Sequence, residues 1–376
     1  MPRVEFYRHD LGDAEIASVS KTLRSLFLTL GPRVGEFERA FGAFIGQEHV
    51  VGVSSCSMAL VLALGALGIG PGDEVITTPM TFVATPNAAL FHRATPVFAD
   101  VEPSTGLIDP AAVEAAITPR TRAVIAVHLY GQLADVRRLR AICDRHHLAF
   151  IEDAAHAIEA ERDGVRVAEL GDAATFSFYA TKTITSGDGG AVVVRDLALR
   201  DRLRRMRNHG VTRDAAARHG GRYQHWDMVE FGYKAAMTDI EAAVLLPQVE
   251  KLARRHHARE AIVERYRRAL AGSPLVELVE PKGRSAHHLF TVRVPAGLRD
   301  RVLVAMSDQG IGVAVNYQAV HTLTYYRERF GYARDAYPVA ASIGERTISL
   351  PLWPGMTDAD VDTVVSVLEA TLSLLR

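Results

Sequence analysis

Cysteine is scarce in this sequence, and long hydrophobic runs are missing. The two cysteines, Cys56 and Cys143, lie far apart and form neither a CxxC pair nor a cluster of metal ligands. This spacing favours neither a disulfide framework nor a zinc site, so we expect two packed thiols and no metal. No stretch stays apolar long enough to cross a bilayer, and the first ten residues lack the apolar core of a signal peptide. The sequence therefore predicts a cytoplasmic protein without a membrane segment.

An excess of charge of either sign is also missing. The 43 basic and 44 acidic residues leave a formal net charge of -1. A chain so balanced has no overall field that attracts a polyanion, and we expect no nucleic-acid partner. With 376 residues, of which 48% are hydrophobic, the chain can bury a large core. Its length allows one large domain and a smaller one.

Between residues 50 and 194, short apolar runs of strand-forming residues alternate with helical patterns. Such alternation is typical of βαβ units, and it predicts an α/β domain with a mostly parallel central sheet and helices on both faces. The expected strands are Val50–Val53, Glu74–Thr77, Thr95–Phe98, Ala123–Val127, Ala149–Glu152, Ala174–Phe178 and Ala191–Val194.

The C-terminal third follows a different pattern. Thr238 and Glu241 have the spacing of a capping box, which predicts a long helix that starts there, is kinked by Pro247 and continues toward Leu270. Beyond about residue 274, alternating runs such as Leu289–Val294 indicate a smaller α+β domain. We expect a large domain over residues 1–250 and a small C-terminal domain over residues 251–376, against which residues 1–12 can also pack.

Lys182 is the first candidate for chemistry. A buried-looking strand over residues 174–178 leads to this lysine and then to the glycine turn at residues 187–190. Ligands of open parallel sheets bind at the carboxyl ends of the strands, so a lysine there points into the expected site. A desolvated lysine has a lowered pKa and can form a Schiff base. Taken alone, a lysine in such a place is more often a surface side chain.

Asp153 and His156, which precede Lys182 in the sequence, strengthen its interpretation as a catalytic group. Asp153 ends an apolar strand, and such a carboxylate keeps a pyridine nitrogen protonated, so that the ring acts as an electron sink. An aspartate that caps the following turn is the common alternative. His156, three residues further on, suits stacking on or hydrogen bonding to such a ring, or is a partly buried residue satisfied by other groups.

A candidate phosphate site lies upstream. Residues 51–60 pass from a strand through small hydroxyl residues into a helix, which directs backbone N–H groups and a helix N-terminus at one point. Ser55 and Ser57 are side-chain donors there, and simple N-capping by serine is the alternative. Phe82 follows another strand end and either supplies an aromatic face for a planar ring or is a core residue.

The order of these elements along the chain is a small-residue turn, an aromatic residue, a strand-end aspartate, Ser177 and Lys182. In this order the chain resembles the fold-type I enzymes that use pyridoxal 5'-phosphate (PLP). More narrowly, the chain resembles the DegT/DnrJ/EryC1/StrS sugar aminotransferase family over nearly its whole length. The blocks that carry this resemblance are Gly70–Ile76, Ala94–Phe98, Asn208–Gly210, Gly232–Asp239 and Leu350–Leu352. It implies a fold-type I PLP transferase with a large domain and a smaller C-terminal one.

The resemblance also implies a role for each matching residue. Lys182 forms the Schiff base with the cofactor and carries protons, and Asp153 pairs with the pyridine nitrogen. The remaining implied contacts with the cofactor are His156 near the ring hydroxyl, Phe82 stacked on the ring, and Cys56, Ser57 and Ser177 around the phosphate.

The sequence departs from the family pattern at three positions. The phosphate turn, usually Ser-Gly-Thr, has Cys56 where glycine is usual, so its backbone must fit there. Lys234 replaces an asparagine that in the family reaches the phosphate of the neighbouring subunit, which a lysine can do as a point charge. Lysine also occurs there in the branch that makes 4-amino sugars, which favours amination at C-4. Ala236 replaces an arginine, which puts a substrate contact from that position in doubt.

Two further regions carry polar side chains. Tyr317 and His321 match a region that in the family lies near the substrate mouth, and the resemblance makes them candidate substrate residues. The arginine-rich pieces 203–207 and 254–257 are more typical of solvated helix faces than of phosphate or metal sites.

Together, the resemblance implies a ping-pong aminotransferase that moves an amino group from a donor, by resemblance L-glutamate, to a keto sugar, with a nucleotide-linked 4-keto sugar favoured. A cyclitol ketone is an open alternative, since the family uses both. A PLP-dependent sugar dehydratase is disfavoured because such members carry histidine at the Lys182 position. A PLP-bound regulator without turnover is disfavoured because Lys182 and Asp153 are both intact. The family also implies a homodimer with shared active sites, each taking Lys234 from the partner chain.

Overall fold

A seven-stranded sheet lies at the centre of the computed structural model, which describes residues 4–213 and 224–375. The strands from β8 to β3 pair in parallel, whereas β9 is antiparallel to both of its neighbours. The predicted α/β fold with a mostly parallel sheet is therefore confirmed. In spatial order the strands are β1 (His49–Val53), β9 (Gly190–Val194), β8 (Ala173–Ser177), β5 (Ala149–Asp153), β4 (Thr121–Val127), β2 (Glu74–Thr77) and β3 (Thr95–Phe98).

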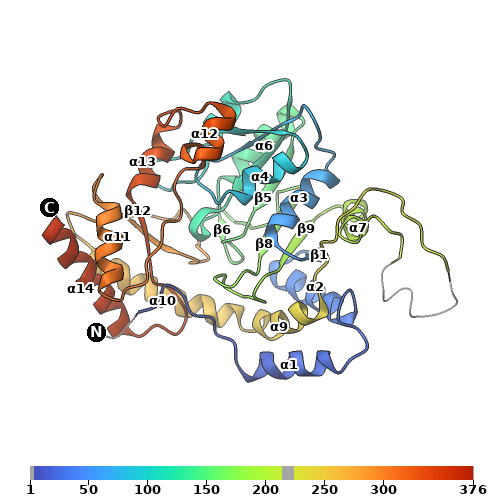
Figure 1. Ribbon diagram of the computed structural model, residues 1–376, viewed down its shortest axis with the longest axis horizontal. Coiled ribbons are helices and arrows are strands. Elements are labelled where there is room, and N and C mark those ends of the chain that lie inside the picture. Colours follow the sequence, from blue (N-terminus) through green and yellow to red (C-terminus); the bar gives the residue numbers. More distant parts are fainter. Residues whose placement is uncertain (1–3, 214–223, 376) are drawn as a thin grey trace.

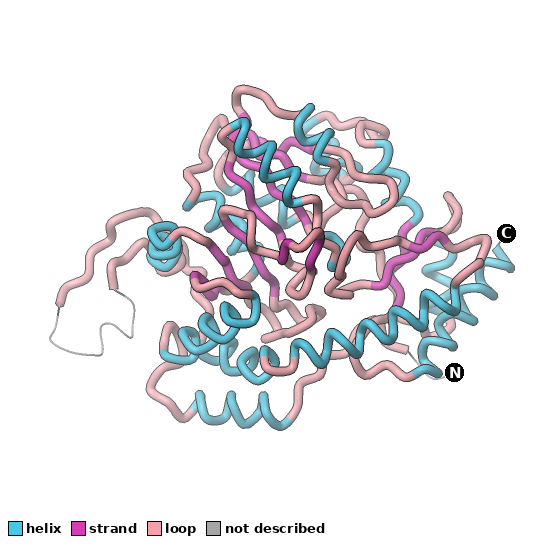
Figure 2. The backbone as a smooth tube through the Cα atoms, turned by 180° about the vertical axis from the view of Figure 1, so that it is seen from behind, coloured by secondary structure: helices cyan, strands magenta, loops and turns pink. Residues whose placement is uncertain are grey.

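Alternate side chains of the strands enter two separate hydrophobic cores, one on each face of the sheet. On β5, for example, Phe150 enters one core and Ile151 the other. Figure 2 shows the strands between helices, as expected for a sheet that is buried on both sides. Helices that contribute to the first core include α2 (Pro32–Ile45), α5 (Pro110–Ala115), α6 (Val136–His146) and α9 (Asp239–Val249), and α3 (Cys56–Ala66), α4 (Ala84–Phe91) and α7 (Leu197–Met206) contribute to the second.

Helix α9 begins at the predicted capping box. The hydroxyl of Thr238 accepts the N–H of Glu241 at 3.1 Å, and the Glu241 carboxylate accepts the N–H of Thr238 at 2.6 Å. The buried carboxylate of Asp239 accepts the backbone N–H groups of Gly31 and Arg33 at 2.6 and 2.8 Å, so it caps α2 from a distant part of the chain. The two helices are thereby joined at their N-terminal ends, next to α1 (Asp13–Leu23), which also packs on α9.

The helix expected to kink at Pro247 is instead interrupted. Helix α9 ends at Val249, and α10 (Leu252–Leu270) begins three residues later. Pro247 has no N–H to bond the preceding turn, which weakens the helix at this point. Helix α10 carries Leu252 into the first core and Tyr266 into a third core, so it links two parts of the molecule.

The third core belongs to the C-terminal part of the chain. There β10 (Glu277–Leu278), β11 (Phe290–Arg293) and β12 (Thr347–Leu350) form an antiparallel sheet. It packs with α10, α11 (Arg299–Asp308) and α14 (Asp358–Leu375), and Val4 joins it by pairing with Ile311. The N-terminal segment consequently lies beside the C-terminal helices (Figure 1). The division of the chain at residue 250 stays a prediction.

The smaller elements are the short pair β6 (Glu161–Arg162) and β7 (Val165–Arg166), the helices α12 (Thr324–Phe330) and α13 (Pro338–Arg346), and the 3-10 turns Leu129–Gly131 and Val320–Thr322. Among the described residues, no helix has both the length and the apolar character needed to cross a membrane.

Some residues expected on solvated helix faces are buried, and the prediction is wrong for them. Arg207, at the end of α7, donates to the buried Glu38 carboxylate at 2.6 Å. Arg255 donates to the Asp10 carboxylate at 3.0 Å, and His256 hydrogen-bonds a backbone carbonyl at 2.8 Å. Each charged or polar group is satisfied by a partner far away in sequence, which the periodicity of one helix does not reveal.

Candidate active site

A cavity of about 550 Å³ opens at the carboxyl ends of β4, β5 and β8. This is the edge of a parallel sheet at which ligands bind. Of the site residues expected from the sequence, the cavity brings together Cys56, Ser57, Phe82, Asp153, His156, Ser177, Lys182 and Tyr317.

Asp153 is the last residue of β5 and is only 5% exposed. Its Oδ2 accepts the hydroxyl of Thr85 at 2.7 Å, and its Oδ1 accepts the N–H of Ala155 at 3.2 Å. Burial raises the pKa of this carboxyl above its usual range, and the two hydrogen bonds and the nearby Lys182 charge oppose that rise. A cation placed against Asp153 would restore its ionised form.

Lys182 lies in the turn that follows β8, where its N–H donates to the carbonyl of Tyr179 at 2.9 Å. Burial lowers the pKa of the Lys182 amine to about 8, against the opposing effect of the nearby Cys56 and Asp153. The neutral amine, which is the nucleophilic form, is therefore reached near physiological pH.

The small-residue turn leads into α3 as the sequence indicates. The Ser55 hydroxyl accepts the N–H of Met58 at 3.2 Å. Ser55 therefore caps the helix, which was the alternative to a role as a phosphate donor. Cys56 and Ser57 are the first two helical residues, whose N–H groups have no acceptor within the helix. Burial raises the pKa of the Cys56 thiol well above its usual range, so the thiol stays protonated.

Strand β9 holds this turn in place through Gly190. A Cβ atom on Gly190 would lie 2.5 Å from the carbonyl carbon of Ser55 and 2.6 Å from the nitrogen of Cys56. Both distances are shorter than real Cβ contacts, so only glycine allows the strand to approach the turn. The Ser177 side chain, one strand further along, also faces the cavity.

Aromatic and imidazole rings also line the cavity. Phe82 is 57% exposed, and its ring centre lies 6.0 Å from that of Tyr317. The Tyr317 hydroxyl shares a hydrogen bond of 3.2 Å with Nε2 of His156, whose ring lies 4.4 Å from that of His288. Burial lowers the pKa of both histidines well below the usual range, so both are neutral. Among the described residues, Nδ1 of His156 has no hydrogen-bond partner.

Two expected site residues lie outside this cavity. Lys234 is exposed and pairs through its backbone with Asn208. His321 is fully buried, where its Nε2 hydrogen-bonds the carbonyl of Arg334 at 3.0 Å and its ring meets the edge of Tyr337. The 3-10 turn at Val320–Thr322 directs His321 away from the site, so the structure does not bring it to the other residues.

Sequence reasoning missed several residues of the site. Thr85, which binds Asp153, follows the end of β2, and its place after a strand end was a usable signal. His288 and Asn316 come from the C-terminal part of the chain. No local pattern in the sequence shows which C-terminal loops face the large sheet.

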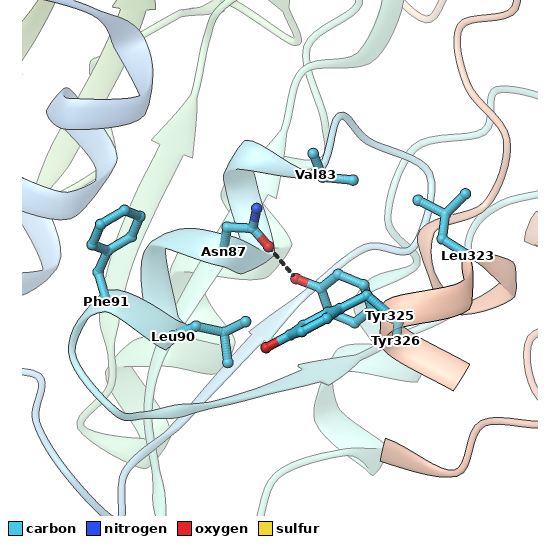
Figure 3. Close-up of a pocket in the computed structure, with 7 residues that line it drawn as sticks. All are labelled: Val83, Asn87, Leu90, Phe91, Leu323, Tyr325 and Tyr326. Carbon is cyan, nitrogen blue, oxygen red and sulfur yellow. Dashed lines mark hydrogen bonds between the residues drawn. The ribbon is translucent and has the colours of Figure 1, made fainter. Parts of the chain in front are cut away.

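A second hollow, of about 510 Å³, lies on the surface between α4 and α12. The Asn87 side-chain oxygen accepts the hydroxyl of Tyr326 there at 2.7 Å (Figure 3). Its lining consists of Val83, Asn87, Leu90, Phe91, Leu323, Tyr325 and Tyr326. None of these seven is a lysine, a histidine or a carboxylate, so the larger cavity is the better candidate for acid–base chemistry.

The larger cavity fits PLP on its own residues. It offers unpaired N–H groups at a helix N-terminus for a phosphate, a buried carboxylate for a ring nitrogen, and an amine of lowered pKa for a carbonyl. Phe82 provides an aromatic face at the rim, where a planar ring can stack.

Comparisons with known proteins agree with this geometry. A family model described as the DegT/DnrJ/EryC1/StrS aminotransferase family matches residues 9–369. The spore coat polysaccharide biosynthesis protein SpsC of Bacillus subtilis (strain 168) is 42% identical over 363 residues, covering 94% of this chain and 93% of SpsC. DesV of S. venezuelae superposes with a TM-score of 0.90 at 35% identity, with 99% of each chain covered.

A third relative bears on the cofactor. The Streptococcus pneumoniae protein Spr1654, classed as a sugar aminotransferase and solved in its PMP form, has a TM-score of 0.92 at 30% identity, with both chains covered completely. PMP is the amino form of PLP, in which an aminotransferase keeps the amine between its two half-reactions. The chain therefore belongs to the DegT/DnrJ/EryC1/StrS aminotransferase family, and it is a PLP-dependent aminotransferase.

Proposed function

We propose that this enzyme transfers an amino group from L-glutamate to a keto sugar, with a nucleotide-linked 4-keto sugar as the preferred acceptor. One observation carries the proposal. Lys182 and Asp153 line one cavity from the ends of the adjacent strands β8 and β5, an amine of lowered pKa beside a buried carboxylate. This is the pair of groups that amine transfer through PLP requires.

The choice of a sugar rests on the relatives and on one residue. SpsC is named for polysaccharide biosynthesis, and Spr1654 is classed as a sugar aminotransferase. Lys234 matches the residue found in the branch of the family that makes 4-amino sugars, which favours amination at C-4. The cytoplasm, where nucleotide-linked sugars are made, is the compartment that this proposal requires.

When bound, PLP supplies the electron sink that makes the carbon of the amino substrate acidic. The Asp153 carboxylate would pair with the ring nitrogen and hold its proton. The N–H groups of Cys56 and Ser57, with the hydroxyls of Ser57 and Ser177, would bind the phosphate.

The remaining residues act on the ring and the substrate. Phe82 would stack on the ring, and His156, which is hydrogen-bonded to Tyr317, would approach the ring hydroxyl. Lys182 in its neutral form would take the proton from the substrate carbon on its Nζ and pass it to the cofactor carbon that receives the amine. Tyr317 also lines the cavity, where it would contact the sugar.

The proposal includes a homodimer in which Lys234 of each chain binds the phosphate held by the other. It is supported by the place of Lys234, which is exposed and outside the cavity of its own chain. A cation from a second chain would neutralise phosphate charge that one helix N-terminus leaves unpaired.

The experiment is an acceptor screen with L-[¹⁵N]glutamate. The enzyme is offered nucleotide-linked 4-keto sugars, nucleotide-linked 3-keto sugars and keto cyclitols, and each product is examined by mass spectrometry and NMR. We expect ¹⁵N at C-4 of a nucleotide-linked sugar. Label only in a cyclitol would establish the alternative acceptor class, and label in none of them would contradict the proposal.

A further inference from the structure

Lys182 also lines a second, much smaller recess, of about 30 Å³. Its walls come from residues 7–10 of the N-terminal segment, residues 180–183 around the lysine, helix α10, and residues 352–354 after β12. Lys182 and Thr181 are shared by this recess and the cofactor cavity, so the reactive amine borders both.

Positive charge dominates the recess. Arg8, Arg255 and Arg259 line it together with Lys182, against the single carboxylate of Asp10. Two of these arginines are already paired, because Arg255 donates to Asp10 at 3.0 Å and Arg259 donates to the buried Glu159 at 2.7 Å. Arg8 is left as a cation with no carboxylate of the described residues within 4.0 Å.

Arg8 is held for recognition by the neighbouring Trp353. Its guanidinium carbon lies 5.3 Å from the centre of the Trp353 ring, and the Trp353 indole N–H donates to the carbonyl of Glu5 at 3.4 Å. A guanidinium against an aromatic face keeps its N–H edge free for a bidentate carboxylate. Arg259 also lines the recess, and its Nη1 is buried and has no hydrogen-bond partner among the described residues.

We propose that this recess binds a carboxylate of the amino donor, with Arg8 as the principal ligand. The inference rests on the proposed function, which requires an amino-acid donor. A carboxylate on the carbon that carries the amine must lie close to Lys182 when that carbon reacts. In the cofactor cavity the groups that suit an anion, the N-terminus of α3 and the hydroxyls of Ser57 and Ser177, are taken by the phosphate of the cofactor in the proposed function, whereas the recess combines contact with Lys182 and surplus positive charge.

The test uses the PLP-loaded enzyme and glutarate, a dicarboxylate without an amine, which binds and does not react. Calorimetry should give an Arg8→Gln variant a Kd for glutarate about 10- to 100-fold weaker than that of the parent, as expected for the loss of a charge-assisted contact. Arg268→Gln, on an exposed part of α10 outside the recess, is the matched control and should leave the Kd unchanged. Glutaramide, which has no charge, should bind the parent at least tenfold more weakly than glutarate.

The donor half-reaction gives a second measurement. In Arg8→Gln, the L-glutamate concentration that gives the half-maximal rate should rise by the same factor as the Kd for glutarate. In Arg8→Lys, this concentration should lie between the values of the parent and of Arg8→Gln. Unchanged glutarate binding in Arg8→Gln, or equal binding of glutarate and glutaramide by the parent, would overturn the inference. Failure of the proposed function would be seen in the acceptor screen, as a lack of sugar product from an enzyme that still binds glutarate through Arg8.

Discussion

The hydroxyl of Thr85 donates a 2.7 Å hydrogen bond to Oδ2 of Asp153. This contact joins the first turn of α4 to the end of β5 and orients the carboxylate into the cavity. Burial raises the pKa of Asp153, so its ionised form depends on such donors and on the cation that it faces.

Replacing Asp153 by asparagine should leave the enzyme folded and able to hold PLP, yet slow the donor half-reaction on the order of 10³-fold, or about 4 kcal/mol. An amide has nearly the same size, but it cannot stabilise a protonated ring nitrogen. Stopped-flow spectroscopy with L-glutamate measures the rate, and Asp308→Asn, exposed at the end of α11, is the control. A parental rate in Asp153→Asn would show that this aspartate is structural.

The rate at which the cofactor-free enzyme captures PLP should depend on pH through Lys182. Burial lowers the pKa of this amine to about 8, so the protonated, unreactive form prevails below that pH. The capture rate should therefore fall about tenfold for each pH unit below 8 and level off above it. A capture rate that keeps rising up to pH 10, as expected for an ordinary lysine of pKa 10.5, would contradict the burial of this amine.

Gly190→Ala should weaken PLP binding by roughly 10- to 100-fold, since forcing atoms into a packed site costs about 1–3 kcal/mol. The added Cβ would displace the turn at Ser55 and Cys56, which it approaches to 2.5 and 2.6 Å. Gly70→Ala is the matched control, because a Cβ there meets nothing within 4 Å. Fluorescence titration of the cofactor-free proteins gives both affinities. Equal PLP affinity in the two variants would show that the turn at Ser55 and Cys56 does not bind the phosphate.

Mixing two inactive variants tests the shared active sites of the proposed dimer. Lys182→Ala and Lys234→Ala chains are unfolded and refolded together, and heterodimers are isolated by two different affinity tags. If Lys234 acts across the interface, one site of each heterodimer has both defects and the other has neither, so up to half of the parental activity per dimer should return. Verified heterodimers without activity would place Lys234 outside the partner's site.

The strands and the proposed catalytic pair could be predicted from the sequence because their causes are local. The apolar runs that form β5 and β8 are buried on both faces, and Asp153 and Lys182 follow from the rule that ligands bind at strand ends. The same reasoning could not find Arg8 or the Glu38–Arg207 pair. Their positions depend on chain segments more than 150 residues apart, which only the packing of the cores brings together.

Reduction of the PLP-loaded enzyme with borohydride tests the central claim most directly. The chain has five lysines, so peptide mass spectrometry can assign a fixed cofactor to one of them without ambiguity. We expect the reduced cofactor on the peptide that contains Lys182, together with loss of the visible absorption band. An adduct on Lys21, Lys234, Lys251 or Lys282 in place of Lys182 would contradict the account.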